Sequence, residues 1–224
     1  MFFEIVNVNK KRQESFFKLV EGFSKKHAIK NIVEIGPGNG ELAERVVTEL
    51  AVDMVMVDLE DKRVFQRGLE FFKADCSSER IPLEDGAADM VIASQVLEHV
   101  ENPTFFINEI DRVLCEGGFC LMSWPNFSNV FQRYDFLKTG NVRRLNGKLN
   151  EGGHVNFITS KQLIHMVSDA WSPVYVNGDA LAFCGRIPGL LNRLSDRFDN
   201  RHIVFPKFKS LMLSYNVDIL FRKK

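Results

Sequence analysis

The chain has 224 residues and 45% of them are hydrophobic, so one domain with a substantial buried core is expected. Lysine plus arginine number 29, and so do aspartate plus glutamate. The formal net charge is therefore zero, and overall charge gives no support for nucleic-acid binding.

The charges are unevenly distributed along the chain. Acidic residues outnumber basic ones over 1–125, and basic residues outnumber acidic ones over 126–224. This asymmetry indicates that the second part either faces an anionic group or presents an ordinary solvated basic surface.

The first 125 residues alternate between predicted helices and predicted strands. Apolar side chains at helical spacing predict helices over 11–27, 41–50, 62–69 and 102–115. Short apolar runs bounded by turn residues predict buried strands over 31–35, 53–58, 70–74, 89–94 and 119–124. Strands alternating with helices favour an α/β fold with a parallel sheet and helices on both faces.

The remaining sequence is interrupted by two segments without clean periodicity. Between them lie a predicted helix over 160–170 and a predicted strand over 171–177, and a last strand is predicted over 211–221. We interpret the chain as a single domain over 1–224 with cap insertions at about 126–157 and 180–207.

The four cysteines form no Cys-x-x-Cys pair, and no histidines join them at zinc-finger spacing. We therefore expect reduced thiols, a cytoplasmic location and no metal site. No run of 18 apolar residues occurs, and the N-terminus lacks the order of a signal peptide, so no membrane span is expected.

A glycine-rich loop follows the strand predicted over 31–35. Glycines at 36, 38 and 40 allow the backbone to approach a ligand where a helix begins. A dinucleotide-binding loop needs a further glycine where Glu41 stands, and an acid is unfavourable beside a pyrophosphate. The loop therefore suits a ligand without a pyrophosphate, which disfavours an NAD-dependent dehydrogenase.

Asp58 ends the next predicted strand, where a carboxylate can accept hydrogen bonds from both ribose hydroxyls. Its alternative role is that of an ordinary turn or helix-capping residue. Combined with the glycine loop, it indicates a nucleoside with a small zwitterionic tail.

Three ordered segments resemble S-adenosylmethionine-dependent methyltransferases of class I. Glu34-x-Gly36-x-Gly38-x-Gly40 resembles their first motif. Residues 82–100, which end in Leu97-Glu98-His99-Val100, and residues 110–118 resemble two further signatures of the small-molecule, "LEHV"-type branch. Gln95 and Glu116 depart from the residues frequent in that branch.

The resemblance implies a three-layer, Rossmann-like fold whose seven-stranded sheet is mostly parallel with an antiparallel last strand. The cofactor would be S-adenosylmethionine, with S-adenosylhomocysteine as product. Gly36, Pro37 and Gly38 would lie against its methionine part and Glu34 would take its ammonium. The other implied contacts are Asp58 with the ribose, Leu59 and Asp75 with the adenine, the backbone of Cys76, and Gln95 beside the methionine tail.

Methyl transfer from a sulfonium is an in-line displacement, so positioning the reactants and excluding water can supply most of the catalysis. A base is required only when the acceptor must lose a proton. His99 and His154 are the candidate catalytic residues for this step. The alternative for His99 is a structural role in its turn.

The acceptor is predicted from the two insertions. Arginine clusters suit phosphate or carboxylate groups, which favours a small or lipid-linked anionic acceptor such as a glycan precursor. The basic residues are Arg133, Lys138, Arg143, Arg144 and Lys148 in the first insertion, and Arg186, Arg193, Arg197 and Arg201 in the second. Aromatic residues in the first insertion leave a quinone- or phenol-type acceptor open.

Two further alternatives concern partners. Ser94-Gln95-Val96-Leu97 follows the fourth strand, where base-amino methyltransferases have an Asn/Asp-Pro-Pro motif, so no nucleic-acid partner is expected. A noncatalytic S-adenosylmethionine-binding or interaction protein of the same fold stays open, as does a homodimer.

Overall fold

The computed structural model describes residues 2–64, 69–140, 153–181 and 214–224. Its helices are α1 (Phe2–His27), α2 (Glu41–Glu49), the short 3₁₀ turn η1 (Leu97–His99), α3 (Pro103–Val113), α4 (Val130–Thr139) and α5 (Ser160–Val167). Its strands are β1 (Asn31–Ile35), β2 (Asp53–Asp58), β3 (Glu70–Lys73), β4 (Ala88–Ser94), β5 (Leu114–Pro125), β6 (Trp171–Leu181) and β7 (Ser214–Lys223).

The strands form one seven-stranded sheet in the order β3-β2-β1-β4-β5-β7-β6. Strands β1 to β5 pair in parallel, whereas β7 pairs antiparallel with both β5 and β6. The predicted fold class is confirmed, including the antiparallel last strand. The strand order reverses between β1 and β4, and ligands of open α/β sheets bind at the carboxyl ends of strands beside such a reversal.

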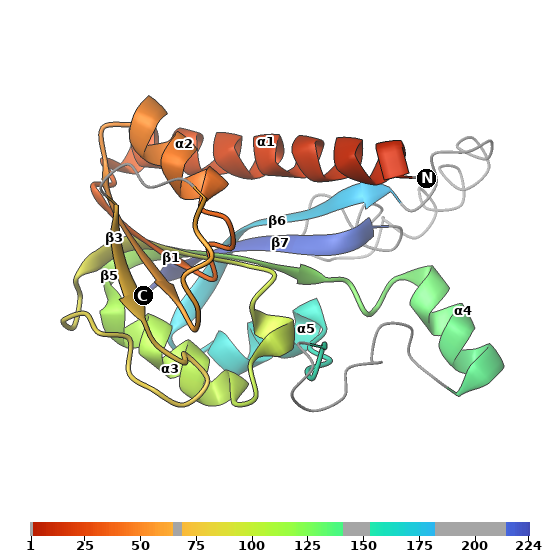
Figure 1. Ribbon diagram of the computed structural model, residues 1–224. Helices are drawn as coiled ribbons and strands as arrows, with labels where there is room; N and C mark the ends of the chain where they lie inside the picture. The colour runs from red at the N-terminus through yellow and green to blue at the C-terminus, as the bar shows by residue number, and fades with distance from the viewer. Residues whose placement is uncertain (1, 65–68, 141–152, 182–213) are drawn as a thin grey trace.

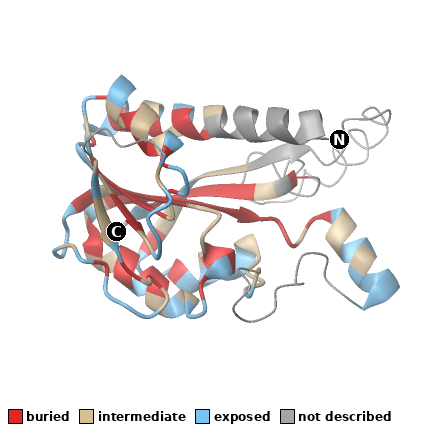
Figure 2. Cartoon of the chain, viewed as in Figure 1, coloured by how far each residue is buried: buried red, intermediate tan, exposed pale blue. Residues whose placement is uncertain are grey.

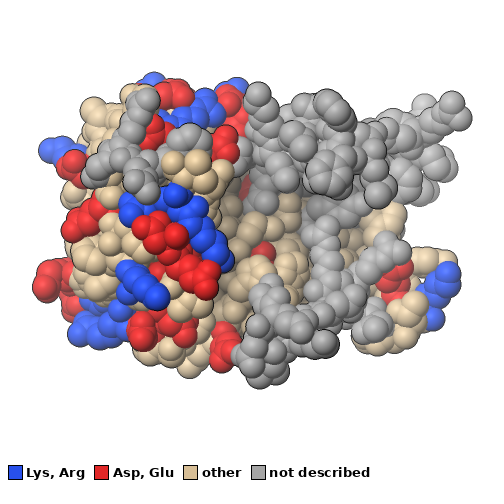
Figure 3. All heavy atoms as spheres, in the orientation of Figure 1, with Lys and Arg blue, Asp and Glu red and all other residues tan. Residues whose placement is uncertain are grey.

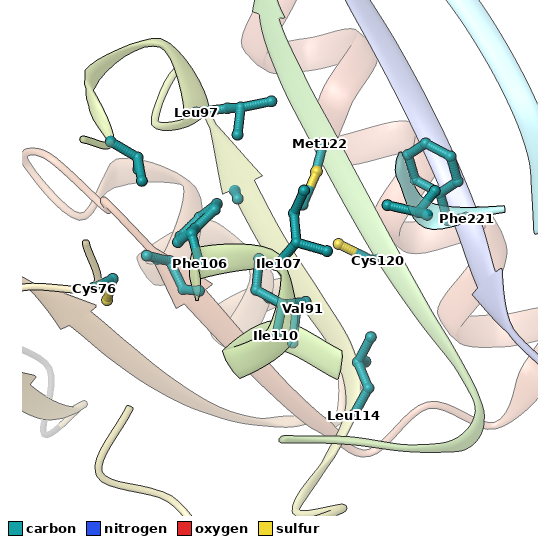
Figure 4. Close-up of a cluster of buried hydrophobic side chains, with 14 of the residues drawn as sticks. Cys76, Val91, Leu97, Phe106, Ile107, Ile110, Leu114, Cys120, Met122 and Phe221 are labelled. Atoms are coloured by element: carbon teal, nitrogen blue, oxygen red, sulfur yellow. The ribbon is translucent and has the colours of Figure 1, made fainter. Parts of the chain in front are cut away.

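The sheet is covered on both faces, with α1 and α2 on one side and α3 and α5 on the other (Figure 1). Adjacent residues of β4 divide between the two faces: Ile92 packs with the α1/α2 cluster and Val91 with the α3/α5 cluster. Figure 4 shows how Phe106 and Ile110 of α3 meet Val91 of β4. Because both faces are covered, the central strands are buried along most of their length (Figure 2).

An arginine fastens the loop before β4 to helix α3. The Arg112 guanidinium, which is 14% exposed, forms an ion pair with Glu109 at 2.7 Å. It also donates to the carbonyl oxygens of Ile81 and Leu83 and to Asp85, at 2.7, 2.8 and 2.8 Å respectively. The ion pair lowers the pKa of Glu109 below its usual value. The loop over 81–87 is therefore held by one side chain of α3.

The first predicted cap insertion contains a helix that the sequence analysis did not foresee. Asn129 caps α4 by accepting hydrogen bonds from the N–H groups of Phe131 and Gln132, and Gly140 ends it in the left-handed conformation, with φ 66°. None of its residues is buried. Helix α4 lies away from the sheet, at the end of β5 (Figure 1). Of the second predicted insertion, only 180–181, at the end of β6, lie within the described residues.

Within the residues that the structure describes, no helix combines the length and apolar character needed to cross a bilayer.

Candidate active site

The loop after β1 requires glycine at Gly36. Its φ is 69°, in the left-handed region, and its N–H donates to the carbonyl oxygen of Val57 at 2.9 Å. A Cβ added to Gly36 would lie 2.4 Å from Cγ2 of Val96. The loop is therefore in close contact with the segment that follows β4.

Gly38 and Gly40 complete the loop with left-handed φ angles of 57° and 79°. A Cβ added to Gly38 would meet no atom within 4 Å, so the backbone there borders open space. Gly40 precedes α2 and provides no side-chain cap for it. Pro37 lies between Gly36 and Gly38, and its carbonyl oxygen accepts the Gly40 N–H at 3.0 Å. The loop thus leaves open space around Gly38 directly before a helix N-terminus.

Glu34 is an acid buried in the strand just before this loop. It is 3% exposed, and its Oε2 atom accepts no hydrogen bond within the described part of the chain. Burial, reinforced by the negative charge of Asp58, raises its pKa to about 8. Since an uncompensated buried carboxylate is costly, this position suits a cationic ligand group such as an ammonium.

Asp58 lies at the end of β2 and is partly buried. Its Oδ1 accepts the N–H of Leu59 at 2.7 Å. The Leu59 side chain is 55% exposed, so an apolar surface is available beside this carboxylate. Both features fit a ribose with an adjacent adenine.

Asp75, which follows β3, holds its own turn together. Its Oδ1 accepts the N–H of Ser77 and its Oδ2 accepts the hydroxyl of Ser78, both at 2.9 Å. The Ser77 hydrogen bond lowers the pKa of Asp75. Burial raises the pKa of the neighbouring Cys76 thiol to about 12, so this thiol is inert and Cys76 acts through its shape and its backbone. Sequence reasoning did not foresee that both Asp75 oxygens bond within the turn.

Gln95 adopts a backbone conformation that is unusual for a residue with a side chain. Its φ is 59°, and its N–H donates to the carbonyl oxygen of Ser123 in β5 at 2.7 Å. This turn directs the chain from the end of β4 past Gly36, through Val96, into η1. Backbone strain of this kind is concentrated at ligand sites.

The two candidate catalytic histidines, far apart in sequence, lie side by side. Their ring centroids are 5.0 Å apart, and His99 Nδ1 lies 3.2 Å from the carbonyl oxygen of Gly153. His99 is exposed and His154 is partly buried. Glu98, which the sequence analysis did not select, is 1% exposed beside them. An acid next to His99 in the Leu-Glu-His-Val turn was the available signal for it.

Most of the basic side chains predicted to recognise an anionic acceptor lie outside the described residues. Arg133 and Lys138 are described on α4, and Arg133 Nε donates to the Ser128 carbonyl oxygen at 2.9 Å. On the face shown in Figure 3, acidic and basic side chains of the described residues are intermixed rather than gathered into one basic surface.

The strand order, the glycine loop after β1 and the acid at the end of β2 are the features of a class I methyltransferase fold. Residues 33–122 match the family described as "Methyltransferase domain". Over this segment the chain is similar to S-adenosylmethionine-dependent methyltransferases, and the cofactor of that family is S-adenosylmethionine.

Two curated relatives illustrate the similarity in sequence. A "Ubiquinone biosynthesis O-methyltransferase" of Psychrobacter cryohalolentis is 28% identical over 153 residues, which are 63% of this chain and 58% of that protein. A "Probable S-adenosylmethionine-dependent methyltransferase" of Mycolicibacterium smegmatis is 29% identical over 100 residues, 43% of this chain and 38% of that protein. The chain thus spans less than two thirds of the length of either relative.

Solved structures share the fold at lower identity. A "SAM dependent methyltransferase from Archaeoglobus fulgidus" is 14% identical with a TM-score of 0.58, covering 93% of this chain and 94% of that one. The "[4+2]-Cyclase SpnF" is 16% identical with a TM-score of 0.60, covering 92% and 80%. At such identities these structures establish the fold alone.

Proposed function

We propose that the protein transfers a methyl group from S-adenosylmethionine to a small or lipid-linked anionic acceptor. Glu34 is the observation that supports S-adenosylmethionine as the cofactor. Its carboxyl group is buried directly before the glycine loop, and its Oε2 atom accepts no hydrogen bond within the described residues. An ammonium is the group that compensates such a carboxylate, and a dinucleotide lacks one at this position. The anionic acceptor is supported by the basic residues over 126–224.

In this proposal the cofactor supplies an activated methyl group and the chain positions it. Glu34 pairs with the ammonium, the loop over 36–38 contacts the methionine part, and Asp58 holds the ribose. Leu59, Asp75 and the backbone of Cys76 contact the adenine, and Gln95 borders the methionine tail. His154 and His99 handle the proton of a hydroxyl acceptor. Positioning of this kind is worth several kcal/mol, about 7–11 in well-oriented systems.

A quinone- or phenol-type acceptor is the second candidate. It is favoured by the relatives named as ubiquinone O-methyltransferases. Exposed apolar side chains on α4 also favour it: Tyr134, Phe136 and Leu137 are 61%, 54% and 84% exposed. The remaining alternative is a noncatalytic S-adenosylmethionine-binding or interaction protein of the same fold, and product formation distinguishes it from an enzyme.

We extend the proposal to the state of the protein in the cell. A cytoplasmic location is supported by free thiols at Cys76, Cys115 and Cys120. A homodimer is the oligomer we would test for, by light scattering of the purified chain.

The first test is calorimetric titration with S-adenosylmethionine, S-adenosylhomocysteine and NAD. We expect micromolar binding of the first two, about −8 kcal/mol, and no binding of NAD. Asp58→Ala should abolish detectable binding. Asp53→Asn, at the opposite, exposed end of β2, is the matched control and should bind like the wild type.

The second test is a search for the acceptor. Release of S-adenosylhomocysteine is followed with phosphorylated glycans, anionic lipids and phenols in parallel. Turnover with phenols alone would replace the anionic acceptor by the second candidate. Tight cofactor binding without turnover on any class would support the noncatalytic alternative, and a preference for NAD would refute the whole proposal.

A further inference from the structure

Glu98, His99 and His154 form a compact cluster at the end of η1. One potential ligand atom from each lies within 4.8 Å of the others. Glu98 is 1% exposed, whereas His99 is exposed to solvent. The cluster therefore has a buried carboxyl end and an end that solvent can reach.

Hydrogen bonds of the backbone, of the Asn156 side chain and of His99 bring the cluster together. The carbonyl oxygen of Glu98 accepts the N–H groups of Val155 and Asn156 at 2.8 and 3.1 Å. The Asn156 side-chain amide donates to the carbonyl oxygens of Leu97 and Val100, on either side of the cluster. The segment over 153–156 is thus fastened along η1, which places His154 beside Glu98 and His99.

The surroundings of His99 determine which ring nitrogen has a lone pair. Nδ1 lies 3.2 Å from the carbonyl oxygen of Gly153, and a carbonyl can only accept. In the neutral imidazole, Nδ1 therefore carries the proton and Nε2 has the lone pair. A metal-binding histidine is held in the same way, with one ring N–H donated to a carbonyl and the other nitrogen on the metal.

The donor set is one carboxylate and two imidazoles. Zn²⁺ takes these donors at about 2.0–2.2 Å, and catalytic zinc sites combine three such ligands with one open position. Tetrahedral ligands at those bond lengths are about 3.4 Å apart, so the three atoms, which lie within 4.8 Å of one another, must move closer when a cation binds.

We propose that Glu98, His99 and His154 bind one divalent cation of the Zn²⁺ type and leave a coordination position open. No metal site was expected from the sequence, because its cysteines and histidines show no zinc-finger spacing. These two histidines meet only through the fold. Cation binding does not depend on the activity proposed above.

The cluster lies close to the cofactor loop. Val96, two residues before Glu98, is the residue whose Cγ2 would meet a Cβ at Gly36. Resting on the proposed function, we assign the open position to the acceptor hydroxyl. A bound cation acidifies such a hydroxyl, and the O–H bond breaks with loss of the proton to water. The oxygen then bonds to the methyl carbon as the carbon–sulfur bond breaks. With the cation bound, His99 and His154 serve this proton loss as ligands of the cation, which replaces the direct proton transfer proposed for them above.

The test is titration of chelator-treated, metal-free protein with ZnCl₂ by calorimetry and with CoCl₂ by visible absorption. We expect one cation per chain and, with Co²⁺, the absorption of a low-symmetry N/O site. His99→Asn and His154→Asn should each weaken binding at least tenfold. His165→Asn, an exposed histidine on α5, is the control and should leave affinity unchanged. Glu98→Gln tests the carboxylate, with circular dichroism as its check on folding.

The outcome of the cation titration can be distinguished from the outcome of the test for methyl transfer. Absence of Zn²⁺ and Co²⁺ binding to the wild type, or equal loss in the His165 control, would overturn the cation site. Binding of S-adenosylmethionine to the metal-free protein is measured in the same preparation. Cation binding without cofactor binding would refute the methyl-transfer proposal and leave the cation site standing.

Discussion

At the scale of single residues, Glu34 couples the stability of the protein to pH. Its pKa rises from 4.5 to about 8 on folding. The folded chain therefore binds more protons than the unfolded chain between these values, and the free energy of unfolding falls as pH rises through this window. We expect a loss of a few kcal/mol between pH 5 and pH 8, measured by urea unfolding. Glu34→Gln should remove most of this slope, and an unchanged slope would refute the assignment.

The same carboxylate should control cofactor affinity in the opposite direction. An ammonium binds the ionised form, so the affinity for S-adenosylmethionine should rise with pH as Glu34 ionises. Glu34→Gln should lower the affinity at least tenfold, about 1.4 kcal/mol, and flatten its pH dependence. Calorimetry at several pH values checks both effects. Retention of wild-type affinity in this variant would remove Glu34 from the site.

Gly36 and Gly38 offer a matched pair of substitutions. Both have left-handed φ angles, but only Gly36 has an atom where a Cβ would lie, Val96 Cγ2 at 2.4 Å. We expect Gly36→Ala to destabilise the fold by about 2–4 kcal/mol and Gly38→Ala by about 1 kcal/mol. Val96→Ala should recover part of the Gly36→Ala loss in a double-mutant cycle. Equal losses for the two alanines would show that the contact with Val96 is unimportant.

At the scale of elements, the loop before β4 depends on the Arg112–Glu109 pair of α3. Removing Arg112 takes the close ion-pair partner from Glu109, which keeps the Ile81 N–H, and it removes the donor to two carbonyl oxygens. Arg112→Ala should therefore cost about 2–3 kcal/mol by thermal or urea unfolding. Arg80, 68% exposed at the same loop, is the control, and Arg80→Ala should change stability by less than about 0.5 kcal/mol.

The pair also has a pH signature. Because Arg112 lowers the pKa of Glu109, this stabilisation is present above the unfolded-state value of 4.5 and is lost as pH falls below it. The free energy of unfolding of Arg112→Ala should therefore differ less from that of the wild type at acid pH than at neutral pH. Urea unfolding at both pH values measures this difference.

A substitution on the exposed face of helix α4 should affect acceptor binding without affecting the stability of the fold. Leu137 is 84% exposed, so Leu137→Ser should change the free energy of unfolding by less than about 0.5 kcal/mol. If α4 contacts an apolar acceptor, the same variant should raise KM with little change in kcat. A destabilisation above 1 kcal/mol would mean that the side chain is buried in solution.

At the scale of the whole molecule, the central strands were predictable because both sheet faces are covered. Their cores appear in the sequence as short apolar runs, and β1, β2 and β4 match the predicted ranges to within a residue. Helix α1 begins at Phe2, well before the predicted start, because the apolar periodicity is clear only from about residue 11. Residues 62–64 are not helical, in contrast to the helix predicted over 62–69.

The residues of the proposed site could be named from the sequence, but their arrangement in space could not. The resemblance named Glu34, Asp58 and the glycines from their order along the chain. The proximity of His154 to His99 depends on backbone hydrogen bonds between distant segments, which leave no periodic trace in the sequence. Glu98 was missed for the same reason, since its burial is a product of that packing.

The fastening of 153–156 to η1 is made largely by main-chain groups, at the carbonyl oxygen of Glu98. Main-chain bonds are indifferent to the identity of the side chains beside them. The route of the chain past the glycine loop therefore depends on main-chain groups more than on the side chains at positions 98 and 154, whereas His99 contributes one contact of its own through Nδ1. The turn is therefore suited to protein engineering, because side chains at positions 98 and 154 can be exchanged while the backbone keeps its course.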